Sequence, residues 1–438
     1  MIRPAIPGAF RLVTFGCKAN QYDSQRLREA LVRRGWREEA EGSPELVILN
    51  TCTVTGEAGR QARQLVRRLA RANPTARIAV TGCHATSDAA ALRALPGVAW
   101  VLARAAEKEP AHLLSLLGHA PDPLDLGIPP GITALAGHTR AFLKIQDGCD
   151  MRCAFCIIPA VRGRNRSRPA EEIAAELRRL LASGHREIVL CGIHIGHWGR
   201  DLGARLGALV ARLAAIEAED AAGRPIDWRL RLSSIEATEV DSELLAAMAR
   251  HPRRIAPHLH LPLQSGDDGV LRRMRRAYRA EQYLAASARI RAALDRPALS
   301  ADVMLGFPGE DEAAFLKTLA ALRAAGIARV HAFPFSPRPG TAAARPAEIG
   351  RPVAPAALRE RRARLAALGA ELAAHYRASL AGARETLVWE GEYGLAGRYQ
   401  RVRVPAGERP SPLPDLLDVT LAIAPGAPPE LVGRVLFR

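Results

Sequence analysis

Three closely spaced cysteines are the part of this chain best suited to metal chemistry. Cys149, Cys153 and Cys156 follow a C-x3-C-x2-C pattern. A structural zinc site uses four protein ligands in a closed tetrahedron, whereas an iron–sulfur cluster held by three thiolates leaves one iron open. An open iron can bind S-adenosylmethionine and begin radical chemistry. The spacing therefore favours a radical cluster, and the alternative is a zinc site completed by His194 or His197.

Three further cysteines follow strand-like segments of the N-terminal region. The strand-like segments span residues 11–15, 46–49 and 77–80. Helical patterns at 21–34 and 60–71 separate them, which is typical of a parallel sheet. Cys17, Cys52 and Cys83 each lie just after one of these strands. Because the carboxyl ends of parallel strands share one edge of a sheet, we expect the three thiols to form a second metal site. The alternative for any one of them is a buried core thiol.

Composition points to a nucleic-acid partner. The chain has 438 residues and a net charge of +17, from 62 basic and 45 acidic side chains. A positive field of this size favours a polyanion. We find neither an apolar stretch long enough for a membrane span nor a secretory leader pattern, so we expect a cytoplasmic protein without a membrane partner. In that setting, seven cysteines indicate metal binding or catalysis before disulfides.

The remaining chain predicts an α/β protein with three parts. Residues 118–138 are rich in proline and glycine and predict a linker. Strand-like segments then recur at 141–145, 187–191, 229–233, 258–261, 299–305 and 329–333. Helical stretches between most of them predict a partial (β/α)6 TIM-like barrel, whose active residues gather at the carboxyl ends of its strands. The expected divisions are an open parallel sheet domain at 1–117, the barrel at 135–356, a connecting helix at 357–382 and a small antiparallel β-barrel at 383–438.

Two arginine clusters are the candidates for RNA binding. Neither contains an acidic residue within its own stretch, and the first adjoins the C-x3-C-x2-C loop. Phosphate contacts there would fix the position of an RNA while a base is drawn into the pocket. The alternative is a solvated helix face. The clusters comprise Arg162, Arg164, Arg166 and Arg168, and Arg272, Arg273, Arg275 and Arg276.

Several motifs together resemble the radical S-adenosylmethionine methylthiotransferase family over nearly the whole chain. Gly16–Asn20, Asn50–Cys52 and Thr81–Cys83 match the N-terminal motifs of that family, and Cys149, Cys153 and Cys156 match its radical motif. Later matches lie at 156–164, 233–236, 260–266, 306–310 and 336–341. The segments 16–24 and 144–149 look most like the branch that acts on N6-threonylcarbamoyladenosine at position 37 of tRNA.

The resemblance implies a reaction and its cofactors. Cys149, Cys153 and Cys156 would hold a [4Fe-4S] cluster that binds S-adenosylmethionine, and Cys17, Cys52 and Cys83 would hold a second [4Fe-4S] cluster that carries the sulfur. A radical would take hydrogen from carbon 2 of the adenine, giving the 2-methylthio derivative. An electron donor and a sulfur source are implied but not identified. Two alternatives keep this chemistry on isopentenyladenosine or on an aspartate of a ribosomal protein. A third is a non-catalytic zinc-binding RNA module.

Smaller expectations concern the S-adenosylmethionine pocket. Phe155 would pack on the adenine, or be ordinary packing beside a buried cluster. Gly192 would contact the methionine moiety, and Ser233 begins the motif in which Glu236 would face the ribose. Gly306 would form a tight turn beside the adenosine. The terminal β segment resembles an RNA-binding TRAM module, although from Ala383 onward its arginines and carboxylates balance; residues 398–403 are its best candidate strand for RNA.

Overall fold

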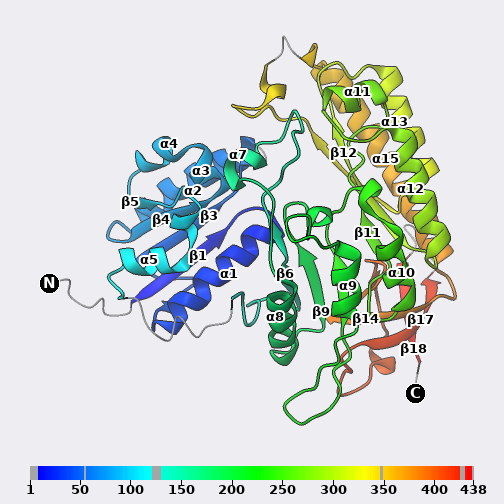
Figure 1. Cartoon of the computed structure of the whole chain (residues 1–438), viewed down its shortest axis with the longest axis horizontal. Coiled ribbons are helices and arrows are strands. Elements are labelled where there is room, and N and C mark those ends of the chain that lie inside the picture. Colours follow the sequence, from blue (N-terminus) through cyan, green and yellow to red (C-terminus); the bar gives the residue numbers. More distant parts are fainter. Residues whose placement is uncertain (1–7, 54–55, 121–129, 346–348, 425–429, 437–438) are drawn as a thin grey trace.

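Three bodies make up the computed structural model of the chain (Figure 1). It describes residues 8–53, 56–120, 130–345, 349–424 and 430–436. Part of the expected linker, residues 121–129, lies outside the described residues, as do residues 437–438 of the expected C-terminal domain. The α/β class and the parallel sheets expected from the sequence are confirmed. None of the described helices combines the length and the apolar composition that a membrane span requires.

The N-terminal domain is a five-stranded parallel sheet with helices on both faces. Its strand order is β2-β1-β3-β4-β5. The strands are β1 (Ala9–Thr14), β2 (Arg37–Glu38), β3 (Leu46–Thr51), β4 (Arg77–Gly82) and β5 (Val98–Val101). The helices are α1 (Lys18–Arg33), α2 (Gly56–Ala72), α3 (Cys83–Ser87), α4 (Ala89–Arg93) and α5 (Pro110–Leu116). Every residue of β3 is buried, because α1 and α5 cover one face of the sheet and α2 covers the other. Strands β2 and β5 were not expected; both are short edge strands with exposed or part-exposed residues.

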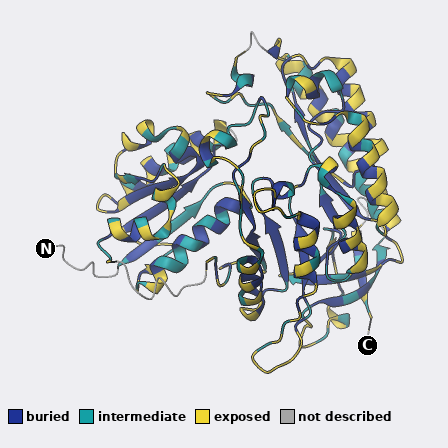
Figure 2. Ribbon diagram, viewed as in Figure 1, coloured by how far each residue is buried: buried dark blue, intermediate teal, exposed yellow. Residues whose placement is uncertain are grey.

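Six parallel strands in chain order form the central partial barrel. They are β6 (Arg140–Lys144), β9 (Glu187–Cys191), β10 (Arg229–Leu232), β11 (His258–His260), β12 (Ala298–Leu305) and β13 (Arg329–Pro334). Two three-stranded sheets contain them, and isolated bridges such as Ser234 to His260 join β10 to β11. The covering helices are α8 (Ala170–Ala182), α9 (Leu206–Ala214), α10 (Ser242–Arg250), α11 (Asp268–Arg273), α12 (Ala280–Ala293) and α13 (Glu312–Ala325). Their buried sides face the strands and their outer sides are exposed (Figure 2).

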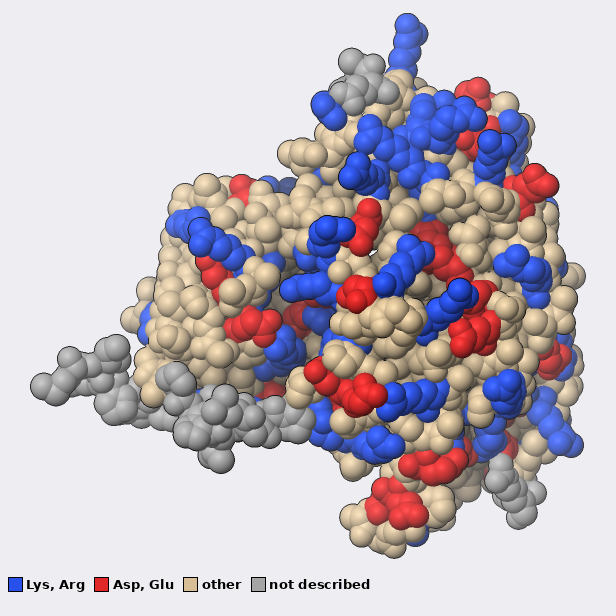
Figure 3. All heavy atoms as spheres, viewed as in Figure 1, with Lys and Arg blue, Asp and Glu red and all other residues tan. Residues whose placement is uncertain are grey.

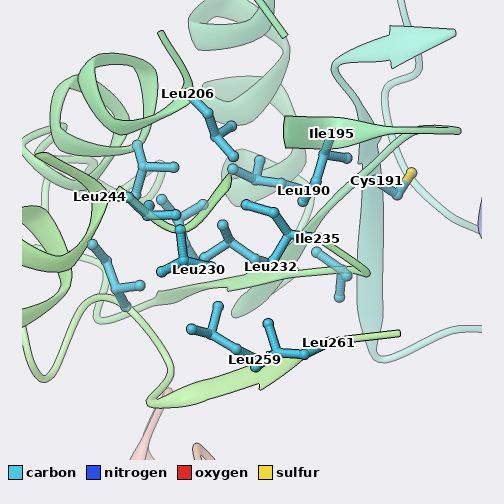
Figure 4. Close-up of a cluster of buried hydrophobic side chains, with 14 of the residues drawn as sticks. Leu190, Cys191, Ile195, Leu206, Leu230, Leu232, Ile235, Leu244, Leu259 and Leu261 are labelled. Atoms are coloured by element: carbon cyan, nitrogen blue, oxygen red, sulfur yellow. The ribbon is translucent and has the colours of Figure 1, made fainter. Parts of the chain in front are cut away.

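Side chains alternate between the two faces of the barrel strands. Leu230, Leu232 and Leu259 point to the helical layer and pack with Leu244, whereas Cys191 points the other way (Figure 4). Cys191 is 1% exposed, and burial raises its pKa to about 12. Cys191 is therefore a packed thiol of the barrel.

The C-terminal domain closes the amino-terminal end of the barrel. Helix α15 (Pro355–Ser379) leads into an antiparallel sheet of order β16-β15-β14-β17-β18. Its strands are β14 (Arg384–Glu390), β15 (Tyr393–Ala396), β16 (Arg401–Val402), β17 (Leu417–Ala424) and β18 (Glu430–Val435). Two buried barrel arginines, Arg229 and Arg231, pair with Glu187 and donate hydrogen bonds to backbone carbonyls of this domain. Arg229 and Arg231 are thus used for docking.

One expected RNA contact in this domain is placed differently. Arg398 is 6% exposed and pairs with Glu385 at 3.0 Å and with Asp295 at 3.0 Å. Its guanidinium therefore fastens the domain to the barrel and is not presented to RNA.

Candidate active site

The first thiol triad lies at the carboxyl edge of the N-terminal sheet. Strand pairing places Thr51 beside Gly82, so Cys52 and Cys83 each follow directly after a paired residue. Cys17 caps the first turn of α1, which starts just beyond β1. The parallel register therefore brings together three cysteines that are far apart in sequence. All three are free thiols; Cys17 is exposed, and Cys52 and Cys83 are buried.

Two glycines allow this close approach. Gly16 has φ +105°, and a Cβ added to it would lie 2.8 Å from Cβ of Cys52 and 3.0 Å from its Sγ. Gly82 has φ +92°, and an added Cβ would lie 2.3 Å from the backbone oxygen of Thr51. Both positions need a left-handed backbone and leave no room for a side chain.

The second triad lies in the loop after β6 and the short strand β7 (Gln146–Asp147). Cys149 N donates to the carbonyl of Gly163 at 3.0 Å, and Ala154 N donates to the carbonyl of Met274 at 2.9 Å. Cys156 N donates to the carbonyl of Cys153 at 3.1 Å. These bonds fix the loop at the carboxyl end of the barrel, where such folds carry their active residues.

N–H groups and nearby cations surround the thiols, which suits anionic sulfur. Met151 N lies 3.4 Å from Sγ of Cys149, and Arg276 Nη1 lies 3.4 Å from Sγ of Cys153. Nδ1 of His194 lies 3.5 Å from Sγ of Cys149. Hydrogen bonds to sulfur are a common feature of protein-bound iron–sulfur clusters. The donor set therefore fits three-thiolate clusters at both triads.

Burial raises the pKa of three cysteines of the two triads. The pKa of Cys156 rises to about 11 for this reason. Burial also raises the pKa of Cys153 and of Cys83, against the opposing charges of Arg276 and Arg162 respectively. A coordinating metal ion removes the thiol proton outright, so metal binding to these buried thiols is coupled to proton release.

Arg162 links the two triads. It ends α7 (Ile158–Arg162), the short helix that follows Cys156, and its Nε donates to Sγ of Cys83 at 3.3 Å. Asp23 and Asp147 pair with its guanidinium at 3.1 and 3.0 Å. A single side chain, that of Arg162, therefore contacts both the N-terminal triad and Asp147, which lies two residues before Cys149.

The residues expected around S-adenosylmethionine gather near the second triad. Phe155 packs edge-on against Phe307, with ring centroids 6.5 Å apart. Glu236 is not a surface carboxylate; it pairs with Arg276, the residue that contacts Cys153. Gly306 has φ +74° and its N donates to Oε2 of Glu310 at 2.9 Å, which makes the expected turn.

Two further glycine and serine positions lie at strand ends beside the loop. Ser233 follows β10 and its N donates to the carbonyl of Leu190 at 3.0 Å. Gly192 follows β9, and a Cβ added there would lie 2.8 Å from the backbone oxygen and from Oε1 of Gln146. Gln146 is fully buried; it accepts from the N of Ile193 and donates to the carbonyl of Gly148. It holds the β9 loop against the cysteine loop, a role that the motif at 144–149 did not predict.

A histidine–carboxylate group lies beside Cys149; its histidines were considered as zinc ligands, whereas its carboxylate was not expected. His194 Nε2 and His197 Nε2 contact Glu239 at 2.7 and 3.0 Å, and Arg200 contacts the same carboxylate at 3.2 Å. Burial opposes ionisation of Glu239, but these hydrogen bonds lower its pKa to about 2. His194 follows the end of β9, a position that the strand-end rule could have identified; Glu239 follows β10 at a distance and had no such signal.

The predicted RNA arginines divide into two sets. Arg162 and Arg276 have side-chain exposures of 7% and 5% and contact thiols, so they lie beside the two cysteine triads and not on the exposed surface. Arg168 pairs with the buried Glu176 at 2.6 Å, and Arg273 donates to the carbonyl of Gly309. The remaining arginines, Arg164, Arg166, Arg272 and Arg275, are exposed.

The first exposed pair borders a hollow between the N-terminal domain and the barrel. A cavity of about 860 Å³ lies there, and its lining includes Arg26, Arg104, Lys108, Arg164 and Arg166. Lys and Arg side chains gather in this hollow and also over the region of α11 (Figure 3). The hollow adjoins Arg162, and therefore the N-terminal triad.

Comparison with known families matches two segments of the chain. The radical SAM superfamily matches residues 143–322, and the family described as "Uncharacterized protein family UPF0004" matches residues 9–103. The first match contains Cys149, Cys153 and Cys156, and the second contains Cys17, Cys52 and Cys83.

Curated relatives are similar over most of their length. The threonylcarbamoyladenosine tRNA methylthiotransferase of Bacillus subtilis is 36% identical over 76% of this chain and 74% of its own. The protein of the same name from Chlamydia pneumoniae is 38% identical over 77% of each chain. The tRNA-2-methylthio-N6-dimethylallyladenosine synthase of a Parafrankia species is 36% identical over 88% of this chain and 78% of its own.

Solved structures share the fold. The radical S-adenosylmethionine methyltransferase TsrM of Kitasatospora setae aligns with a TM-score of 0.54 and 15% identity, covering 74% of this chain and 72% of its own. This likeness concerns the fold alone.

Proposed function

Because the chain belongs to the radical S-adenosylmethionine methylthiotransferase family, we propose that it methylthiolates N6-threonylcarbamoyladenosine at position 37 of tRNA, at carbon 2 of the adenine. The single observation that best supports this is the contact from Arg162, in the radical loop, to Cys83 of the other triad. A base held between two such centres could meet a radical on one side and a sulfur donor on the other.

Each triad would hold one [4Fe-4S] cluster. When bound, the two clusters and S-adenosylmethionine supply the radical, the sulfur and the methyl group that the reaction needs. The protein contributes ligands, orientation and charge. Arg162 and Arg276 place positive charge beside thiolate sulfur, and the Gln146 hydrogen bonds keep the cysteine loop in position.

S-adenosylmethionine would lie at the carboxyl end of the barrel. Phe155 and Gly306 would border its adenosine, Glu236 and Ser233 its ribose side, and Gly192 its methionine moiety. The exposed Arg164 and Arg166, with the basic hollow beside them, would bind tRNA phosphates, as would Arg272 and Arg275. A tRNA substrate places the reaction in the cytoplasm, with an electron donor and a sulfur source still to be identified.

Nucleoside analysis of tRNA tests the substrate. We expect tRNA from a deletion strain to lose 2-methylthio-N6-threonylcarbamoyladenosine and to accumulate the unthiolated nucleoside, with recovery on complementation. Loss of the 2-methylthio-dimethylallyl nucleoside instead would favour the second substrate, which one similar relative is named for. Unchanged tRNA in a strain with no second such enzyme would reject both, leaving the ribosomal aspartate as target.

A zinc-binding RNA module is the alternative from another class, and it is favoured by the histidine beside Cys149 and by the cluster of His194, His197 and Glu239. Metal analysis after anaerobic purification separates the two. A brown protein that contains iron and sulfide supports the enzyme. A colourless protein that takes up zinc alone supports the module.

A further inference from the structure

The inner wall of the barrel is unusually polar. A closed TIM barrel fills its interior with branched apolar side chains. Here a chain of hydrogen bonds runs along β11 and β12: His260 Nδ1 contacts Oγ of Ser300 at 2.9 Å, and His260 Nε2 contacts Oδ1 of Asp302 at 3.2 Å. The ring of His331 lies 5.5 Å from that of His260. His260, Asp302 and His331 all keep part of their surface exposed, so a polar ligand can reach this wall.

The amino-terminal end of this wall is closed. Tyr399, from the C-terminal domain, stacks on His258 with ring centroids 4.9 Å apart. The guanidinium groups of Arg231 and Arg140 lie over the Tyr399 ring, 4.7 and 5.5 Å from its centroid. A ligand therefore reaches the polar wall from the carboxyl end, where the cysteines lie.

Lys18 faces this wall from the N-terminal domain. It follows Cys17 as the first residue of α1. Tyr22 lies one turn further on the same face of α1, and it packs against the barrel, with Oη 3.1 Å from Oε2 of Glu176 and Nζ of Lys144 5.3 Å from its ring centroid. Lys18 therefore lies on the side of α1 that faces the barrel.

The charge of Lys18 affects the pKa values of residues around the wall. The pKa of His331 is lowered by burial first and then by neighbouring cations, Lys18 among them. The pKa of Tyr399 is lowered against the effect of burial, by Arg140 and then by Lys18 and Arg231. Lys18 also acts on Cys191. These residues come from three different parts of the fold that border the barrel interior, in agreement with the position of Lys18 on the barrel side of α1.

No side chain within the described residues neutralises this ammonium. Lys18 is half-buried, and no hydrogen bond or ion pair of its Nζ occurs within these residues. The nearby carboxylates have other partners: Asp23 and Asp147 pair with Lys144, and Asp302 pairs with His260. A partly enclosed cation without a partner favours an anionic ligand.

We propose that Lys18 binds the carboxylate of the threonylcarbamoyl group on the substrate adenine. This rests on the proposed function and extends it to specificity. The threonine part of that group carries a free carboxylate, whereas a dimethylallyl group is an uncharged hydrocarbon that would gain nothing from a lysine on a polar wall. Because Lys18 adjoins Cys17, it would hold the substituent one residue away from the centre that supplies sulfur.

The test pairs a change in the ligand with a change in the protein. Two anticodon stem–loop RNAs are compared with the reconstituted enzyme: one carries N6-threonylcarbamoyladenosine, and the other carries its methyl ester, which lacks the negative charge. For the unaltered enzyme we expect the ester to bind roughly 10- to 100-fold more weakly. For Lys18→Gln we expect the two RNAs to bind equally. Lys18→Arg should retain most of the preference for the acid.

Controls separate the possible failures. Arg93→Gln removes a cation from the exposed side of α4 in the same domain and should keep the preference. Equal binding of acid and ester by the unaltered enzyme would overturn the proposal without any variant, as would a full preference retained by Lys18→Gln. If the unaltered enzyme also forms no methylthio product from the acid RNA, the proposed function fails; if it forms the product, only the role of Lys18 fails.

Discussion

At the scale of single residues, Arg162 and Arg276 lie beside thiols, whereas the arginine-rich segments that contain them predicted RNA contacts. Arg162 and Arg276 stand in arginine-rich segments that are typical of RNA contacts, and four of their neighbours are indeed exposed. The identity of the residues gave no indication that these two turn inward. Only the carboxylates that pair with them, Asp23, Asp147 and Glu236, explain why they can be buried.

The first prediction concerns Arg162. Arg162→Gln leaves Asp23 and Asp147 paired with Lys144, so we expect a loss of stability smaller than the cost of about 3–5 kcal/mol for a buried charge left without any partner. Loss of positive charge beside Cys83 should also make the midpoint potential of the N-terminal centre more negative. Thermal unfolding and an electron paramagnetic resonance redox titration measure the two effects.

Arg166→Gln is the matched control for this change. Arg166 lies four residues further along the same segment and is exposed, so its loss should leave both measurements nearly unchanged. Equal effects of the two substitutions would contradict the placement of Arg162 at the thiol.

At the scale of elements, most of the candidate site residues could be predicted from the ends of the predicted strands. The strands that precede Cys17, Cys52, Cys83 and Cys149 were all predictable from apolar runs, because strands buried on both faces read as continuous apolar segments. Short edge strands such as β2 and β5, and contacts such as Gln146 to the β9 loop, were not. They depend on residues far apart in sequence, which a periodic pattern in one segment does not contain.

The second prediction concerns the turn before Cys83. Gly82→Ala places a Cβ against the backbone oxygen of Thr51, at 2.3 Å, in a residue with φ +92°. The left-handed backbone alone costs about 1–2 kcal/mol for a residue with a side chain, and the contact adds to this. We expect loss of iron from the N-terminal centre, measured by iron analysis in a variant that lacks Cys149, Cys153 and Cys156.

Gly184→Ala separates strain from contact. Gly184 has φ +99° but an added Cβ would meet nothing within 4 Å. It should therefore show the backbone cost in thermal unfolding while retaining iron. Equal retention of iron in the Gly82 variant would show that the turn does not position Cys83.

At the scale of the whole molecule, the C-terminal domain is fastened to the barrel by buried arginines. Arg231 pairs with Glu187 at 2.7 Å and donates to the carbonyls of Gly397 and Ala396. Arg231→Met should leave the buried Glu187 short of a partner, at a cost of about 3–5 kcal/mol. Limited proteolysis should then cut near residues 380–384, at the start of the domain.

Arg401→Met serves as the control for docking. Arg401 is exposed and lies over the ring of Tyr393 within its own domain. Its replacement should leave the protease pattern unchanged. Resistance of the Arg231 variant to proteolysis, together with an unchanged unfolding temperature, would contradict the docking role.

RNA binding is also a property of the whole surface. Arg164 and Arg166 are exposed beside the basic hollow. If both contact phosphates, replacing both with glutamine should weaken tRNA binding without changing which tRNA is preferred. The slope of the logarithm of affinity against the logarithm of salt concentration should fall by about 2. An unchanged slope would exclude these two residues from the interface.

Two open three-thiolate centres facing each other are the basis of this account, and an iron count on the reconstituted chain tests them most directly. We expect about eight irons per chain, and about four when either Cys17, Cys52 and Cys83 or Cys149, Cys153 and Cys156 are replaced by alanine. Four irons in the unaltered chain, with one triple replacement having no effect on iron, would contradict the second centre and with it the proposed reaction.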